Sequence, residues 1–252
     1  MIAKPASIAT AVLLTCSAVA MADQGSKSAT GESTEDIPES VNESQAPATG
    51  GLAVFQPPLR GAPARRVGGA TRGTDGETLF LTVLAPEGIG LTIQESPNLY
   101  WFVSDVPNRA VEFALIRDDR IEPVTEATLT AHEGLGIAKI SLADLGVTLE
   151  PDVAYEWSIA LVADYQQRSQ DIVTSGMLQR VIPDADLGTK LQAEDTEDRL
   201  VAYAGAGYWY DAIDLVSSAI ASETAAQRWK AHRTSLLEQV DLPQVAAYDR
   251  SL

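Results

Sequence analysis

The chain has 252 residues, a formal net charge of −17 and a single cysteine, and these figures already exclude some classes of protein. An acidic chain lacks the clustered Lys and Arg that neutralise phosphates, so we expect no nucleic-acid partner and no binding to anionic lipid. Roughly 200 residues remain beyond a polar N-terminal tail, enough for one moderate domain and a smaller one.

Residues 1–22 have the composition of a secretory signal peptide. Met1–Lys4 supplies one positive charge, and Ile8–Val19 is an apolar run too short to cross a bilayer. Ala20-Met21-Ala22 offers small residues at alternate positions, so we expect cleavage before Asp23 and a periplasmic or secreted protein. Loss of the signal peptide removes one positive charge and changes the formal charge from −17 to −18.

Cys16 offers an alternative fate, because Leu13-Leu14-Thr15-Cys16 has the outline of a lipoprotein box. Thr15 is a poor residue before such a cysteine, so we expect cleavage after Ala22 and not lipidation. The mature chain then has no cysteine, and its stability must come from packing without disulfides. We find no later segment apolar enough to span a membrane.

The tail that follows changes character twice. Residues 23–58 are predicted to be a disordered acidic linker, because most of this stretch is polar and has almost no large apolar side chain. Residues 59–76 form an Arg/Gly-rich lead-in, the one basic island of the chain. Its candidate interaction residues Arg65, Arg66 and Arg72 can clamp a carboxylate or phosphate of a partner, or pair with the acidic body of the same chain.

Residues 77–183 are predicted to form an immunoglobulin-like β-sandwich. Odd positions from Val111 to Leu115 and from Tyr155 to Leu161 are large and apolar, which is typical of strands with one buried face. We expect Trp101 and Trp157 to fill the space between two sheets. The predicted strands are Thr78–Leu84, Leu99–Val103, Ala110–Ile116, Thr125–Thr130, Ile137–Leu142, Tyr155–Ala163 and Ile172–Val181.

Residues 184–252 are predicted to be helical, because apolar residues recur there at intervals of three and four. The candidate helices are Thr196–Ala206, Tyr208–Ala221 and Thr224–Val240. The first two would form an αα-hairpin similar to a tetratricopeptide unit, although only one such unit is visible and a solenoid needs several. The expected fold class is therefore β-rich plus α, with a sandwich followed by a helical tail.

The start of the second helix carries the run Tyr208-Trp209-Tyr210-Asp211. Adjacent side chains on a helix face different directions, so we expect that not all of them are buried. One of them is then an exposed anchor for a partner, since Trp and Tyr dominate interface hot spots. The alternative is that the run fastens the helical tail to the sandwich.

These residues together carry a resemblance. The Arg65–Gly73 lead-in, the Leu81–Glu87 strand, Tyr155-Glu156-Trp157 and the Tyr-Trp-Tyr-Asp run resemble, in this order, a bacterial family described as domain of unknown function 928. The similarity covers about residues 55–240. It implies export and a strand-rich region followed by helices, with no known activity or catalytic residue. The family commonly has cysteines in the lead-in and a late strand, and this chain has none there.

Side chains for catalysis are sparse. His132 lies in a turn-like segment and His232 on the exposed-looking side of the last helix, with no second histidine at metal-binding spacing. No nucleophile elbow, phosphate loop, dinucleotide fingerprint or calcium loop is present, so we expect no catalytic residue, no metal and no cofactor. Paired carboxylates remain open, since 35 acidic residues can supply two at hydrolase spacing.

The sequence therefore favours an exported, non-enzymatic interaction module that binds another protein of the bacterial envelope. The alternative is an envelope glycan-binding protein, or a glycoside hydrolase that uses paired carboxylates. A purely structural envelope protein is a third hypothesis, which nothing in the sequence separates from the first.

Overall fold

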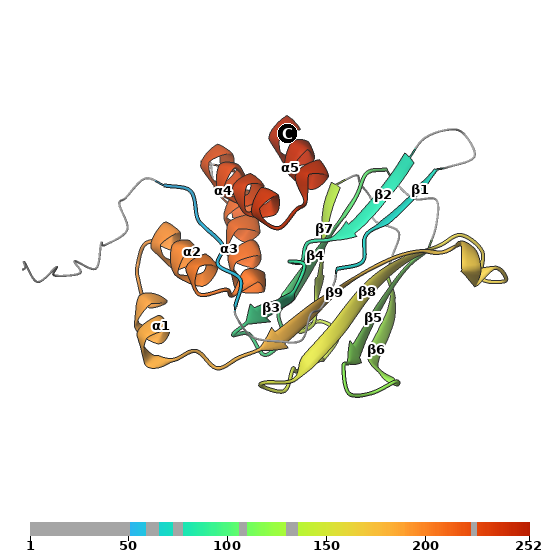
Figure 1. The fold of residues 1–252 in the computed structure, drawn as a ribbon, viewed down its shortest axis with the longest axis horizontal. Helices are drawn as coiled ribbons and strands as arrows, with labels where there is room; N and C mark the ends of the chain where they lie inside the picture. The colour runs from blue at the N-terminus through green and yellow to red at the C-terminus, as the bar shows by residue number, and fades with distance from the viewer. Residues whose placement is uncertain (1–50, 59–65, 73–77, 106–109, 130–135, 223–225) are drawn as a thin grey trace, which may run out of the picture. The chain divides into compact units, whose positions relative to one another are not determined.

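A computed structural model of the chain describes residues 51–58, 66–72, 78–105, 110–129, 136–222 and 226–252 (Figure 1). Two β-sheets and a group of helices make up the described residues, which confirms a β-rich plus α fold. The predicted signal peptide and most of the predicted linker lie outside the described residues.

The smaller sheet has four antiparallel strands in the order β1-β2-β4-β7. Its strands are β1 (Gly69–Arg72), β2 (Thr78–Val83), β4 (Asn98–Val103) and β7 (Gly136–Ser141). β4 lies between β2 and β7, so strands that are distant in sequence become neighbours. Leu99, Tyr100, Trp101 and Phe102 of β4 are all buried, as expected for an interior strand.

The larger sheet has five strands in the order β3-β9-β8-β5-β6. Its strands are β3 (Ile89–Thr92), β9 (Ile172–Arg180), β8 (Ala154–Val162), β5 (Ala110–Arg117) and β6 (Pro123–Leu129). β3 pairs with β9 in parallel, and every other pair in this sheet is antiparallel. β6 and β3 are therefore the two edges of the larger sheet.

The seven predicted strands all form, with ends that shift by one or two residues. β1 and β3, which have only four residues each, are not among the strands predicted from the sequence. Both contain glycine, and neither is long enough to show an alternating pattern. Gly90 of β3 is required by a close approach, because a Cβ there would lie 2.6 Å from the Tyr210 ring.

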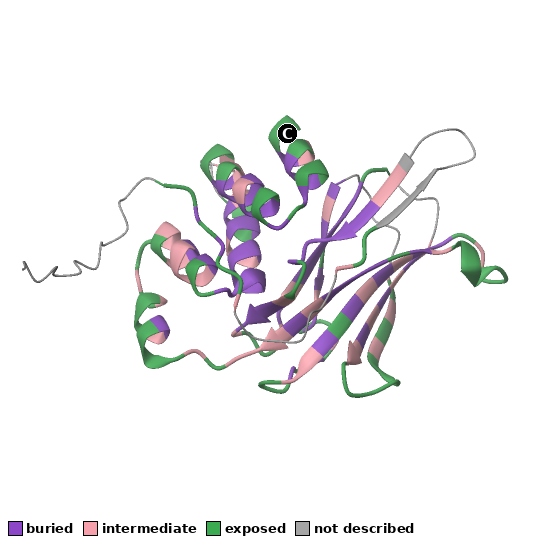
Figure 2. Ribbon diagram, in the orientation of Figure 1, coloured by how far each residue is buried: buried purple, intermediate pink, exposed green. Residues whose placement is uncertain are grey.

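Inward-facing side chains of both sheets contribute to one apolar core. Val111, Phe113 and Leu115 of β5 are at most 2 % exposed, and Trp157 of β8 is fully buried, as the alternating pattern predicted. The buried residues run through the strands and on into the helices (Figure 2).

In the described part of the chain five α-helices follow the strands, and a short 3₁₀ helix, η1 (Arg168–Gln170), precedes β9. They are α1 (Ala185–Lys190), α2 (Thr196–Gly205), α3 (Trp209–Ser222), α4 (Ala226–Gln239) and α5 (Pro243–Ser251). Consecutive helices pack on one another, and α3 contacts β3 and β4 (Figure 1). The three predicted helices are confirmed as α2, α3 and α4.

α1 and α5 are not among the helices predicted from the sequence, although each has a recognisable start. Asp184 caps α1 by accepting a hydrogen bond from the Leu187 backbone N–H. Pro243 occupies the first turn of α5, where a missing N–H costs nothing. Both helices are short, so their apolar periodicity is weak.

Residues 51–58 differ from the linker prediction, because they pack against the helices. Ala53 and Phe55 are buried, and the Gln56 N–H donates to the Ala204 carbonyl at 3.0 Å. The turn after α2 makes room for this segment. Gly207 has a φ of +82°, and a Cβ there would lie 2.9 Å from the Gln56 carbonyl oxygen.

Candidate functional site

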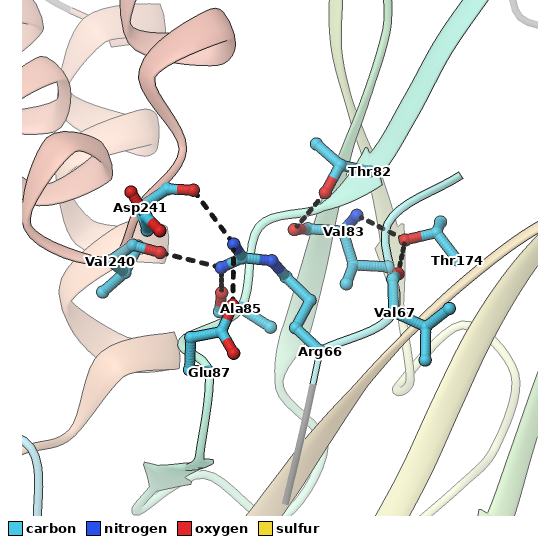
Figure 3. Close-up of polar contacts among 9 residues, drawn as sticks. All are labelled: Arg66, Val67, Thr82, Val83, Ala85, Glu87, Thr174, Val240 and Asp241. Atoms are coloured by element: carbon cyan, nitrogen blue, oxygen red, sulfur yellow. Dashed lines mark hydrogen bonds and ion pairs between the residues drawn. The ribbon is translucent and has the colours of Figure 1, made fainter. Parts of the chain in front are cut away.

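Arg66 lies where the strands meet the helices (Figure 3). Its Nη1 donates to the Ala85 carbonyl at 2.7 Å and to the Val240 carbonyl at 2.8 Å. Its Nη2 donates to the Asp241 carbonyl at 3.0 Å and lies 3.3 Å from a Glu87 carboxylate oxygen. One guanidinium thus joins the segment after β2 to the residues that end α4.

The position of Arg66 follows from the chemistry of a helix end. The last carbonyls of a helix have no partner within it and form the negative end of its dipole, which favours a cation there. Asp241, just past the end of α4, has a φ of +62°, the left-handed conformation that often ends a helix. Burial lowers the pKa of Arg66, and the nearby Glu87 and Asp241 oppose this shift.

The next residue, Val67, fastens the lead-in to the larger sheet. Its N–H and carbonyl exchange hydrogen bonds with Ser175 of β9, at 3.0 and 3.1 Å. The Thr174 hydroxyl donates to the Val67 carbonyl at 2.5 Å and accepts from the Val83 N–H at 3.2 Å (Figure 3). The buried Thr174 hydroxyl therefore links the lead-in, β9 and β2.

The predicted arginine site is brought together only in part. Arg66 contacts its own chain, which favours the intramolecular alternative for this residue. Arg65 lies outside the described residues. Arg72 ends β1, and its side chain lies outside the described part of the structure.

The run Tyr208-Trp209-Tyr210-Asp211 is buried throughout, with exposed fractions of 6, 0, 2 and 5 %. The prediction that part of it stays exposed is therefore wrong. Strands, the 51–58 segment and neighbouring helices surround the start of α3, so side chains that face different directions all find a packed environment. The run fastens the helices to the strands, as the alternative held.

Both aromatic side chains inside α3 use their polar atoms for this contact. Trp209 donates from Nε1 to the Leu84 carbonyl at 2.8 Å, and its ring packs edge-on against Phe55 with centroids 5.0 Å apart. The Tyr210 hydroxyl donates to the Met177 carbonyl at 2.9 Å and accepts from Trp157 Nε1, also at 2.9 Å. Burial raises the pKa of Tyr210, so its hydroxyl stays protonated.

Asp211 and Asp214 lie three residues apart on α3 and so share a face of the helix. Asp211 Oδ2 accepts from the Ile93 N–H at 3.0 Å, while its Oδ1 is buried without a hydrogen-bond partner among the described residues. Burial raises the pKa of Asp211 to about 7, and the nearby Asp214 adds to this shift. Hydrogen bonds from the Ile93 N–H and the Thr92 side chain oppose it.

Asp214 is held by two side chains of β4. Its Oδ1 accepts from the Tyr100 hydroxyl at 2.7 Å and from Asn98 Nδ2 at 2.9 Å. Burial and the negative charge of Asp214 raise the pKa of Tyr100, which keeps this phenol protonated as a donor. The two carboxylates therefore attach α3 to both sheets, Asp211 at Ile93, directly after β3, and Asp214 at β4.

The sequence predicts that His232 lies on an exposed helix face. This prediction is wrong, because His232 is only 1 % exposed. Its Nδ1 accepts from the Ala53 N–H at 3.2 Å, so Nε2 carries the proton toward Glu197 Oε1 at 2.9 Å. Burial lowers the pKa of His232, with a further contribution from Arg228. The 51–58 segment covers this histidine, which explains the incorrect prediction. His132 lies outside the described residues.

One buried ion pair had no signal in the sequence analysis. Arg233 of α4 donates to both carboxylate oxygens of Asp249 in α5, at 2.9 and 2.5 Å, and to the Ser217 hydroxyl at 3.2 Å. The Asp249 side chain is fully buried and that of Arg233 is 8 % exposed. The two residues are 16 positions apart in the chain, so no local helix spacing could have indicated the pair.

Neither a metal-binding cluster nor a membrane-spanning helix occurs within the ranges that the structure describes. No three His, Cys, Asp or Glu side chains come together there as a metal-binding group. No helix in these ranges is long and apolar enough to cross a membrane. Asp211 has a pKa suited to proton transfer, but its carboxyl is shielded from solvent.

These contacts define a class of protein: two β-sheets and a C-terminal helical layer that share one core. The chain belongs to the family described as Domain of Unknown Function (DUF928), which matches residues 67–249. The match confirms the resemblance drawn from the motifs, and it extends nine residues beyond the expected end at residue 240. No curated protein matches the chain.

Proposed function

We propose that the chain is an exported, non-enzymatic interaction module of the bacterial envelope. The observation that supports this best is the contrast between candidate residues that are buried and an edge strand that is exposed. The Tyr208–Asp211 run and Arg66 are committed to internal contacts, whereas no described element covers β6, the strand of the larger sheet on the side away from the helices (Figure 1). A fold that is stabilised by such internal contacts can present a rigid binding surface.

We also propose that the two sheets form an immunoglobulin-like sandwich. In chain order β2, β4, β5, β6, β7, β8 and β9 correspond to strands A, B, C, C′, E, F and G, with β3 as a part of strand A that pairs with the other sheet. Tyr155, near the start of β8, accepts from the Glu150 N–H at 3.1 Å, the position and contact of a tyrosine corner. A different strand order in an experimental structure would overturn this assignment.

The turns and contacts of the helices support a tetratricopeptide-like arrangement of the helical layer. Short turns at 206–208 and 240–242 join α2 to α3 and α4 to α5, and the two helices of each pair contact one another, as in an αα-hairpin. Gly207 and Asp241, one in each turn, have positive φ. We propose two αα-hairpins, one more than the sequence pattern revealed.

The glycan alternative predicts two accessible carboxylates beside exposed aromatic side chains. Asp211 is 5 % exposed, Trp209 and Tyr210 are buried, and Asp214 is engaged by Tyr100 and Asn98. This arrangement supports the binding module over a hydrolase.

Photocrosslinking in native cells tests the proposal. A photoreactive amino acid replaces Thr128, which is exposed on β6, and in a matched control replaces Glu194, which is exposed before α2. Protein adducts that form from position 128 but not from position 194, in the exported fraction, support the interaction module. Adducts to glycans alone would favour the carbohydrate alternative, and retention of the chain in the cytoplasm would contradict export.

A further inference from the structure

β6 is an open edge of the larger sheet. Its only neighbour among the described strands is β5, whereas α3 contacts the opposite edge, β3. β6 lies on the side away from the helices (Figure 1). An edge strand presents a row of backbone N–H and C=O groups, with which another extended chain can pair.

Neither face of β6 is buried (Figure 2). Glu126 and Thr128 on one face are exposed, while Thr125, Ala127 and Leu129 on the other are intermediate. A strand added beside β6 would therefore pair with its backbone and contact side chains on both faces.

The first residues of β6 limit where pairing can occur. Pro123 has no N–H, and the register with β5 shifts so that Leu115 pairs with Thr125 while Ile116 pairs with Pro123. Val124 is thus an extra, bulged residue, and proline and bulges are the usual protection of a sheet edge. The regular part of the edge is residues 125–129, which spans roughly 17 Å.

This edge carries negative charge. Glu126, Glu112 of β5 and Glu156 of β8 lie on the same face of the sheet, as the strand registers and the alternation of side chains require. Arg168 pairs with Glu112, but Glu126 and Glu156 form no ion pair with any residue that the structure describes. The chain as a whole has a formal charge of −17. Its negative electrostatic field disfavours a second copy of the chain at this edge and favours a positively charged partner.

We propose that residues 125–129 accept an extended cationic segment of a partner protein, which adds a sixth strand beside β6. Alternate side chains of a strand share a face, so Lys or Arg residues two apart on the added strand would face Glu126 and its acidic neighbours. The backbone pairing supplies affinity and the basic side chains supply selectivity. This inference rests on the proposed function as an interaction module and specifies its site and partner.

The test uses the purified chain and a synthetic peptide of about nine residues, alternating valine and lysine with capped ends, long enough for one strand. Binding is measured by calorimetry, and amide hydrogen exchange is followed along the chain. Two further peptides are the same sequence N-methylated at alternate residues, which keeps the charge but blocks pairing along one edge, and a valine–glutamate version. The protein variants are Glu126→Lys and the matched Glu194→Lys.

We expect the valine–lysine peptide to bind and to slow exchange of β6 amides, and the other two peptides to bind much more weakly. Glu126→Lys should weaken binding about fivefold, the effect of a cross-strand charge pair, and Glu194→Lys should not. Absence of binding, equal binding of the N-methylated peptide, or unchanged exchange in β6 would overturn the inference. If crosslinks form from position 128 in cells but the peptide does not bind the purified chain, the proposed interaction module stands. Only the proposal of a cationic added strand is then overturned.

Discussion

Trp157 Nε1 donates to the Tyr210 hydroxyl at 2.9 Å, and this hydrogen bond joins the middle of the larger sheet to the first turn of α3. The same hydroxyl donates to the Met177 carbonyl, and the Trp157 and Tyr210 rings pack edge to face, 6.4 Å between centroids. The helices and the sheets are therefore joined by specific polar contacts inside a shared apolar core.

Tyr210→Phe should reduce the free energy of unfolding by about 1–3 kcal/mol, because it leaves the buried Trp157 N–H without a partner and removes the hydrogen bond to the Met177 carbonyl. The loss is measured by urea denaturation followed by tryptophan fluorescence. Tyr165→Phe is the control, since Tyr165 is 58 % exposed. Equal stability of the two variants would show that the Trp157–Tyr210 bond contributes nothing.

Phe55→Ala should reduce the free energy of unfolding by about 3–5 kcal/mol, the usual cost of removing a buried phenylalanine. Its ring packs on Trp209, and the backbone N–H of Phe55 donates to Gln239 Oε1 at 2.8 Å. Val54→Ala is the matched neighbour, because Val54 is 60 % exposed. If thermal unfolding is the same for both variants, the 51–58 segment does not belong to the folded unit.

Arg66→Ala should cost about 2–3 kcal/mol of unfolding free energy, since the Ala85, Val240 and Asp241 carbonyls lose a charged donor. The loss should persist in high salt, because buried charges are poorly screened. Arg250→Ala is the comparison: Arg250 forms an exposed ion pair with Glu238, and such pairs contribute at most about 1 kcal/mol. Denaturation at low and high salt distinguishes the two variants. Equal losses of stability that vanish in high salt would contradict a stabilising role of the buried Arg66 contacts.

Asp211 makes stability depend on pH in a defined direction. Its pKa in the folded chain is raised to about 7 from an ordinary 3.8, so between these values the folded state holds a proton that the unfolded state has released. The free energy of unfolding therefore falls as pH rises through this window, by on the order of 4 kcal/mol in total, and levels off above it.

Asp211→Asn should remove this dependence while the amide oxygen still accepts from the Ile93 N–H. The measured quantity is the difference between wild-type and variant unfolding free energies from about pH 4 to pH 8, which cancels other titrating groups. Glu112 and Asp119 have lowered pKa values, so their contributions are lost as pH falls and run in the opposite direction. A difference that stays constant with pH would contradict the raised pKa of Asp211.

The strands and helices that sequence analysis predicted correctly are those with a long local pattern. Alternation over eight or nine residues marks β5 and β8, and helical periodicity over fourteen marks α3. β1 and β3 have only four residues each, and α1 has six, which is fewer than two helical turns. Pro243 could have located α5, because proline in the first turn is a start signal.

The roles of Arg66, His232 and the Tyr208–Asp211 run depend on contacts with distant parts of the chain. Arg66 binds carbonyls up to 175 positions away, and His232 accepts from Ala53, 179 positions away. The same holds for the Tyr208–Asp211 run, whose burial requires β3, β9 and the 51–58 segment around α3. No local pattern encodes these partners.

The sequence by itself determined the acidic charge, the scarcity of histidine and cysteine and most of the strands and helices, because composition and periodicity are local properties. The tertiary structure alone decided which polar side chains are buried, that Arg66 and Tyr210 join the helices to the sheets, and that β6 is left open. Burial and edge exposure depend on which segments become neighbours, and neighbours are set by packing across the whole chain.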